Sequence, residues 1–257
     1  MRHHPVQAAT SMVGAMAIIG LIDNYIALIA RDISLWQFQF LRGTIAVPTL
    51  LVLAAAGVFI VRPKRLWAVL VRNGLIAVGM LFYFGALAFM PIAQALAGLF
   101  VAPIFVLLIS IFVFGERVGL LRITAVIAGF IGVLIVLQPE QGSFSLISLM
   151  PMMGGLFYAM GSVATQRLCP EEATPAMLLG LFSLQATFGA TVLVALHVIN
   201  PVAAPGTDGF LLRQWTTPQS FTWLLIVVQA FGSLMGVGLL IRAYQSAEPS
   251  FAAVFEY

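Results

Sequence analysis

Two oppositely charged residues interrupt the first apolar stretches of the chain, and their spacing pairs them. The turn between these stretches centres on Asp32 and Ile33, and Asp23 and Arg42 lie nine residues to either side of it. In antiparallel helices, residues equidistant from a turn lie at one depth, here roughly 13 Å below it at ~1.5 Å per residue. An isolated charge at that depth costs about 2.5–3.5 kcal/mol, and pairing reduces this cost. The pair is therefore either an anchor for a charged or zwitterionic substrate or a structural pair that orients two helices.

A third charged residue, Glu256, lies near the end of the chain, about eight residues into its last apolar segment. At ~1.5 Å per residue this position approaches the middle of a membrane. A carboxylate at that depth is a candidate proton carrier. The alternative is that it pairs with a residue beyond Tyr257.

Several uncharged polar residues also lie within apolar segments. Each can line a polar cavity, or it can bond a neighbouring helix for about 0.6 kcal/mol on average. The candidates for substrate contact are Tyr83, Gln94, Tyr158, Gln185 and Gln229.

The composition makes the lipid bilayer the solvent of this chain. Its 257 residues are 61% hydrophobic and 8% charged, with a mean hydropathy of +1.07, whereas a soluble domain carries roughly 25% charged residues. The apolar segments lack the alternation of barrel strands, so helices are expected. We place them at 8–30, 35–60, 66–89, 92–114, 119–138, 145–166, 174–198 and 220–242, with a ninth beginning near Glu248.

The basic residues set the expected orientation, because cytoplasmic loops are rich in Lys and Arg. With the N-terminus in the cytoplasm of a bacterial cell, only Arg31 and Arg213 fall outside the inner membrane. Nine basic residues then fall on the inner side: Arg2, Arg62, Lys64, Arg65, Arg72, Arg117, Arg122, Arg167 and Arg242.

Other kinds of site lack their residues. Cys169 is the single cysteine, and the acids are dispersed, so we expect no metal site and no cofactor. No basic cluster is interleaved with aromatic residues, which argues against a nucleic-acid partner. The glycines Gly232 and Gly236 lie at a spacing that lets helices approach closely, either inside one chain or across a homodimer.

A pattern near the middle of the chain returns at its end. The uncharged run from Asn73 to Gly115 contains the helix–turn–helix block Ala86–Ala97, and Ala243–Val254 repeats its layout 157 residues later. Five segments separate the copies, so the copies point in opposite directions, as inverted repeats of transporters do. We divide the chain into a first repeat at 1–140 and a second at 141–257.

The residues of the first copy carry a resemblance to a known family. An Ala-Leu helix end, a proline turn, a helix opening with small residues, a proline inside that helix and a final Gly-Glu resemble the EamA family of the drug/metabolite transporter superfamily. These are Ala86, Leu87, Pro91, Ala93, Ala97, Pro103, Gly115 and Glu116. The resemblance implies an all-α membrane protein with ten helices in two inverted five-helix repeats. The second copy stops before the equivalents of Pro103 and Glu116, so we expect about eight and a half of these helices.

The motif residues receive structural roles. Pro103 should kink its helix and free a carbonyl group. Glu116 should cap a helix or pair with Arg117 or Arg122 rather than contact substrate.

The function implied is that of a secondary transporter working by alternating access as a monomer or homodimer. Its substrate would be a small metabolite, an amino acid or related amphoteric compound, moved by proton coupling or by exchange. The alternatives are an integral-membrane enzyme acting on a lipid-soluble substrate and an inactive transporter fragment. Clustered carboxylates or a nucleophile with its base, which such an enzyme needs, are missing from the sequence pattern.

Overall fold

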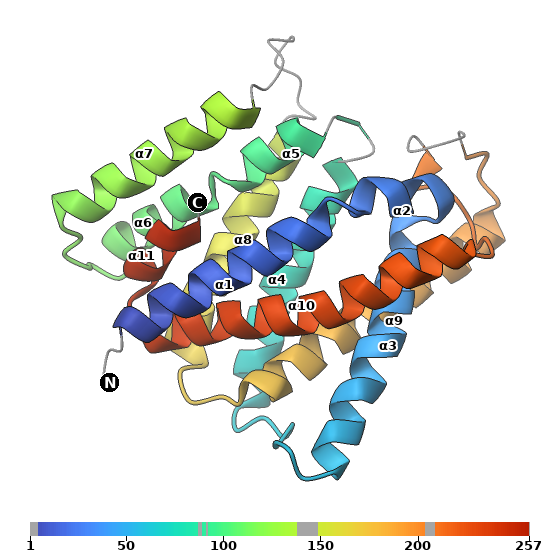
Figure 1. Ribbon diagram of the computed structural model, residues 1–257, viewed down its shortest axis with the longest axis horizontal. Helices are drawn as coiled ribbons and strands as arrows, with labels where there is room; N and C mark the ends of the chain where they lie inside the picture. Colours follow the sequence, from blue (N-terminus) through green and yellow to red (C-terminus); the bar gives the residue numbers. More distant parts are fainter. Residues whose placement is uncertain (1–4, 87–88, 91, 138–148, 204–208, 257) are drawn as a thin grey trace. The chain divides into compact units, whose positions relative to one another are not determined.

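The computed structural model describes residues 5–86, 89–90, 92–137, 149–203 and 209–256, and all regular structure in these ranges is helical. Figure 1 shows the helices in chain order. They are α1 (Pro5–Asp23), α2 (Ile26–Asp32), α3 (Leu35–Ala55), α4 (Leu66–Ala86), α5 (Ile92–Leu99), α6 (Ala102–Phe112), α7 (Leu120–Leu137), α8 (Leu149–Leu168), α9 (Thr174–Ile199), α10 (Ser220–Ser246) and α11 (Pro249–Ala252), followed by a 3-10 helix at Ala253–Glu256.

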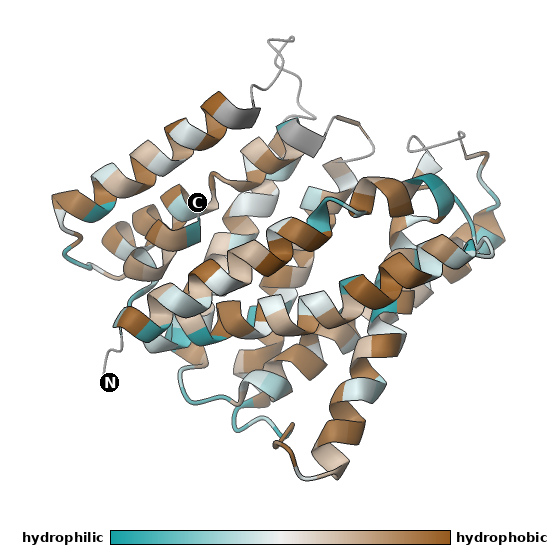
Figure 2. Cartoon of the chain, in the orientation of Figure 1, coloured by the Kyte–Doolittle hydropathy of each residue, from teal (hydrophilic) through white to brown (hydrophobic). Residues whose placement is uncertain are grey.

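The helices have the length and apolar character of membrane spans. In the described ranges, six helical stretches are long and apolar enough to cross a membrane, and α7 contains a shorter apolar helix. In Figure 2 the hydrophobic colour runs along the helices, and the hydrophilic colour gathers at connections such as those between α3 and α4 and between α8 and α9. The predicted all-α membrane fold is confirmed, and the chain is a multi-pass membrane protein.

Two of the predicted segments are broken helices. The first divides into α1 and α2 at Asn24 and Tyr25, where the Asn24 side chain donates to the carbonyl of Gly20 at 2.6 Å. The fourth divides into α5 and α6, and Pro103 lies in the first turn of α6. A proline ring clashes with the carbonyl four residues earlier, here that of Leu99, but suits a helix start. The expected kink is therefore a helix break.

The described chain forms two compact units. Unit 1 contains Met1–Met16, Lys64–Glu172 and Leu239–Tyr257, and unit 2 contains Ala17–Pro63 and Ala173–Gly238. Thus α4 to α8 and α11 belong to unit 1, α2, α3 and α9 belong to unit 2, and α1 and α10 each contribute to both.

Unit 1 is organised around the packing of α4 against α8. The two backbones approach at Gly79 and Gly154, where an added Cβ would lie 2.9 and 3.0 Å from the other glycine's carbonyl oxygen. On α8, Gly155 meets the Leu99 carbonyl that Pro103 displaces, at 3.1 Å from a Cβ built on Gly155. Glycine is the residue that permits such approaches in membrane helices.

Unit 2 is organised around the antiparallel packing of α3 against α9. A Cβ on Gly43 would meet Phe182 and Ala186, and a Cβ on Gly189 would meet Trp36 and Phe40. The sequence offset that takes Gly43 to Gly189 also takes Trp36 to Phe182 and Phe40 to Ala186. The first set of contacts therefore becomes the second. The interface is therefore equivalent when α3 and α9 exchange places.

A shorter interface in unit 2 joins the second part of α1 to the first part of α10. A Cβ on Gly232 would lie 2.7 Å from Ile22, and one on Gly236 would lie 2.8 Å from Ile19. Both glycines thus serve close packing inside the chain.

An acidic side chain caps the start of a helix in each unit. In unit 1, the Glu172 carboxylate accepts from the backbone N–H groups of Lys64 and Arg65 at 2.8 and 2.6 Å, just before α4 begins. In unit 2, the Asp32 carboxylate accepts from the N–H of Gln219 at 2.9 Å, just before α10 begins. Each carboxylate bonds backbone donors just ahead of a helix N-terminus, where a negative charge is favourable.

Candidate functional site

The centre of the polar part of unit 2 is the guanidinium of Arg42, which α3 places in the interface with α9. One of its nitrogens, Nη2, donates to Oε1 of Gln39 at 2.5 Å and to Oε1 of Gln185 at 2.9 Å. Its Cζ lies 4.8 Å from the ring centroid of Phe38 and 5.6 Å from that of Phe182. Arg42 is 6% exposed, so amide oxygens and aromatic faces replace water around the charge. We call these five residues the Arg42 cluster.

Asp23 faces this charge from the break in the first helix. It is the last residue of α1, and it interacts electrostatically with Arg42. The break leaves the Ile22 carbonyl available, and the side-chain nitrogen of Gln229 on α10 donates to it at 2.6 Å. Discontinuous helices form the substrate sites of many transporters.

Two buried amide atoms near this region lack partners in the described part of the chain. They are Nε2 of Gln39, a donor, and Oε1 of Gln229, an acceptor. Both side chains are almost wholly buried, at 2% and 0% exposure. Leaving a buried polar group unbonded costs about 1–3 kcal/mol, so unpaired groups mark places where a ligand can bond.

A second polar cluster lies in unit 1 and is centred on Glu256. Its Oε1 accepts from the hydroxyl of Tyr244 on α10 and from that of Tyr158 on α8, the latter at 3.4 Å. Glu256 is 5% exposed and Tyr244 is fully buried. We call these three residues the Glu256 cluster.

Unit 1 also contains a fully buried cation, Arg72 on α4. Its Nε donates to Thr165 of α8 at 2.9 Å and its Nη1 to Asn73 at 2.8 Å. The distribution of basic residues predicted that Arg72 lies on the inner side of the membrane. In the structure its side chain is buried in the α4–α8 interface. Gln229 follows Arg72 by 157 residues, the same offset as from Ala86 to Ala243, and it is also fully buried.

The structure thus divides the sequence-predicted candidates between the units. Asp23, Arg42, Gln185 and Gln229 lie together in unit 2, and Tyr158 and Glu256 lie together in unit 1. The other two, Tyr83 and Gln94, belong to unit 1: Tyr83 is buried with its ring 5.1 Å from that of Phe84, and Gln94 is half-buried on α5. Pro91 lies outside the described residues.

Four residues of these clusters were not singled out from the sequence: Phe38, Gln39, Phe182 and Tyr244. Gln39 precedes Arg42 by three residues and therefore shares its helix face, a signal that the sequence did contain. Tyr244 stands in the repeated helix–turn–helix block, twelve residues before Glu256, and only the folded hairpin brings them together.

The motif residues Gly115 and Glu116 form a helix end. Gly115 has a φ of 64°, a conformation that favours glycine, and it terminates α6. Glu116 then bonds Arg167 of α8 and accepts from Ser250 at 3.1 Å. Glu116 was expected to cap a helix or to pair with Arg117 or Arg122; its partner is Arg167, and Arg122 bonds Glu248 at 2.5 Å. Arg167 is far from Glu116 in the sequence, so only the folded structure shows that α8 lies beside Glu116.

Among the described residues, no group of three His, Cys, Asp or Glu side chains is arranged to hold a metal ion. The chemistry that the two clusters offer is hydrogen bonding, charge pairing and proton exchange.

The sequence matches known transporters. The model of the EamA-like transporter family matches residues 7–138. The chain is 28% identical to a riboflavin transporter of Vibrio cholerae over 100% of this chain and 82% of the relative. It is 24% identical to an S-adenosylmethionine uptake transporter of Rickettsia prowazekii over 70% of this chain and 57% of that relative. A solved crystal structure shares its fold with a TM-score of 0.72 at 18% identity, covering 98% of this chain and 83% of the other.

Proposed function

Because this chain belongs to the EamA-like transporter family, we propose that it is a secondary transporter that moves a small metabolite by alternating access. In this proposal it works in a bacterial inner membrane with its N-terminus in the cytoplasm, and 1–140 and 141–257 are its two inverted repeats. The equivalent contacts of Gly43 and Gly189 support the division into repeats.

The observation that carries the proposal is the Arg42 cluster. The described structure gives Arg42 two neutral amide acceptors at hydrogen-bonding distance, while Asp23 interacts with it electrostatically. The guanidinium keeps its positive charge beside these neutral amides, and such a charge suits an anionic or carbonyl group of a ligand. The unpaired atoms of Gln39 and Gln229 add one donor and one acceptor to the same unit.

This arrangement favours an amphoteric or strongly hydrogen-bonding substrate. A carboxylate or carbonyl edge would bind Arg42, and an amino group would bind Asp23. S-adenosylmethionine contains an amino-acid group, and riboflavin carries a ring edge of alternating donors and acceptors. The names of the two relatives are therefore compatible with the chemistry of the cluster.

The test is transport by the purified protein in proteoliposomes. Riboflavin, S-adenosylmethionine and a set of amino acids would be offered singly as labelled compounds, with and without a proton gradient. We expect uptake of at least one compound, and we expect Asp23→Asn and Arg42→Gln each to impair it. Arg31→Gln, which removes an exposed charge on α2, is the matched control and should transport normally. Normal transport by both Asp23→Asn and Arg42→Gln would exclude this site.

A further inference from the structure

We propose that Glu256, with the hydroxyls of Tyr158 and Tyr244, is a proton-binding site in unit 1, and that its protonation drives the transport cycle. The coupling rests on the proposed transport function, whereas the proton site itself does not. The reaction is the reversible addition of one proton to the Glu256 carboxylate, taken from water on one side of the membrane and released to the other.

The hydrogen bonds define a site with one open position. Both tyrosine hydroxyls donate to the same carboxylate oxygen, Oε1. Within the described part of the chain, no donor lies on Oε2. A proton can therefore bind Oε2 without breaking either existing bond, and the two phenols hold the carboxyl group in one orientation in both states.

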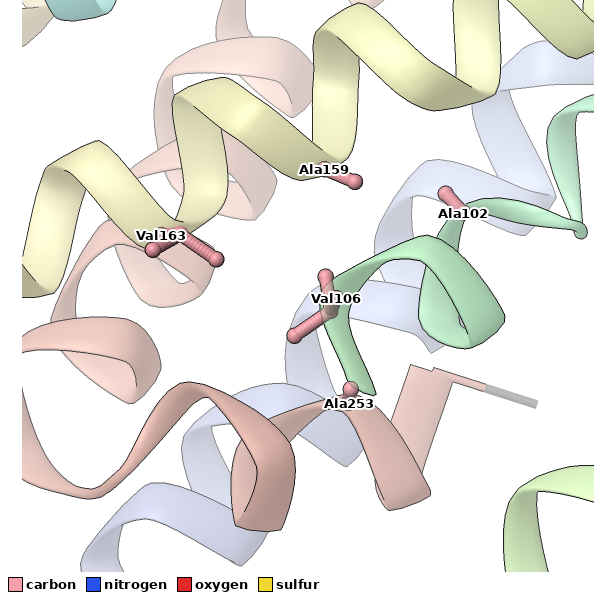
Figure 3. Close-up of a cluster of buried hydrophobic side chains, with 5 residues drawn as sticks. All are labelled: Ala102, Val106, Ala159, Val163 and Ala253. Carbon is pink, nitrogen blue, oxygen red and sulfur yellow. The ribbon is translucent and has the colours of Figure 1, made fainter. Parts of the chain in front are cut away.

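The surroundings of the site are apolar. Three residues before Glu256, Ala253 packs into a cluster with Ala102 and Val106 of α6 and Ala159 and Val163 of α8. Figure 3 shows these side chains where α6, α8 and the end of the chain meet. A carboxylate beside such a cluster is poorly solvated, so its charge is costly and binding a proton removes that cost.

The cations of the neighbouring helices make their hydrogen bonds and ion pairs with other residues in the described structure. Arg72 on α4 bonds Thr165 and Asn73, and it interacts electrostatically with Tyr158. On α7, Arg122 bonds Glu248 and Ser250, and on α8, Arg167 bonds Glu116. The helix α6 has no ionisable side chain, and Arg242 on α10 is exposed.

This separates Glu256 from the other buried carboxylate of the clusters. Asp23 has Arg42 as an electrostatic partner. For Glu256, the ion pairs of the described residues provide no such partner. The three oxygen-bearing side chains are also fewer than the roughly six to eight oxygens that a calcium ion takes. A proton is therefore the ligand that fits.

The first experiment observes the proton directly, without substrate. Infrared difference spectra of the purified full-length protein in lipid, recorded through a pH titration, report the carbonyl stretch of protonated carboxyl groups. We expect Glu256→Gln to remove one such band. Asp23→Asn is the control with an equally conservative change, and it should leave this band in place. A band that persists unchanged in Glu256→Gln would overturn the proposal.

The tyrosines provide a second set of variants. The double change of Tyr158→Phe and Tyr244→Phe removes both donors and keeps the rings, so the packing is retained. We expect the band to remain and to shift to higher frequency, because the carbonyl loses its hydrogen bonds. An unshifted band would show that these hydroxyls do not hold the proton-binding group.

The second experiment tests the coupling in proteoliposomes. Riboflavin is added outside, and a pH-sensitive dye in the lumen reports proton movement. We expect Glu256→Gln to lose the riboflavin-dependent pH change and gradient-driven accumulation while keeping exchange of riboflavin at equal pH. Gradient-driven accumulation by Glu256→Gln, or accumulation that follows a sodium gradient instead, would overturn the coupling. Absence of any flux in the wild type, with the infrared band present, would count against the transport assignment and leave the proton site standing.

Discussion

Gln39 and Gln185 accept hydrogen bonds from the same guanidinium nitrogen of Arg42, although one lies in α3 and the other in α9. The sequence offset that takes Gly43 to Gly189 also takes Gln39 to Gln185, so the two amides are equivalent positions of the α3–α9 interface. The same offset takes Arg42 to Phe188, which is apolar. A symmetric pair of acceptors thus holds a single charge that has no counterpart at the equivalent position of α9.

The bifurcated bond predicts that arginine cannot be replaced by lysine at this position. Lysine keeps the charge but loses the planar array of donors that reaches both amides. We expect Arg42→Lys to lower the affinity for the transported compound at least tenfold, since one lost charge-assisted bond is worth roughly 1.5–3 kcal/mol. Equilibrium binding to detergent-solubilised protein measures this.

The control for this change is the melting temperature of the same samples. If Arg42→Lys melts normally and binds normally, the two amide bonds have no part in recognition. Gln185→Ala should weaken binding less than Arg42→Lys, because Gln39 still holds the guanidinium.

The glycines of the α3–α9 interface predict a sharp steric effect. A Cβ on Gly189 would lie 2.5 Å from the carbonyl oxygen of Trp36, a backbone atom that cannot rotate away. We expect Gly189→Ala to reduce the yield of folded protein severely, as judged by size-exclusion profiles and thermal melting. Gly20→Ala is the matched control, since a Cβ on Gly20 meets nothing within 4 Å. Equal yields of the two variants would contradict the close α3–α9 approach.

Much of this fold could be predicted from the chain because the bilayer imposes simple rules. Apolar length and punctuating charges placed the spans, so α3 was expected at 35–60 and is found at Leu35–Ala55. The motif residues Gly115 and Pro103 mark helix ends by backbone geometry alone, which is local and therefore visible in a sequence.

The contacts between distant helices were less accessible. The sequence pairs Asp23 with Arg42 by depth, and the two interact electrostatically, but the direct bond of Arg42 to Gln185 depends on how α3 and α9 face each other. The partner of Glu116 is Arg167, because packing brings the ends of α6 and α8 together. Rotation of a helix about its own axis decides such pairs, and an evenly apolar helix gives little sign of that rotation.

The two carboxylate caps should differ in strength. Glu172 is 6% exposed and accepts two backbone bonds, whereas Asp32 is half-exposed and accepts one at an exposed position. We expect Glu172→Ala to lower the free energy of unfolding by about 2 kcal/mol and Asp32→Ala to lower it by about 0.5–1 kcal/mol. The second loss is smaller because water can replace the exposed hydrogen bond of Asp32. Chemical unfolding of the purified protein in mild detergent measures both. A larger loss for Asp32→Ala would contradict the structural difference between the caps.

The single cysteine is a reporter for the junction between α8 and α9. Burial raises the pKa of the Cys169 thiol from 9.0 to about 11, and its side chain is 0% exposed. The thiolate is the reactive form, and this rise in the pKa reduces the thiolate fraction about 100-fold near neutral pH. We expect slow maleimide labelling in membranes, a rate that continues to rise above pH 9, and fast labelling after unfolding in dodecyl sulfate.

The side chain of Gln245 donates to the carbonyls of Cys169 and Glu172 at 2.7 and 2.9 Å and closes this junction. Gln245→Ala should therefore accelerate labelling of the folded protein, and Ser246→Ala, whose hydroxyl bonds only within α10 in the described structure, should not. Rapid labelling of the unaltered protein would show that the junction is open.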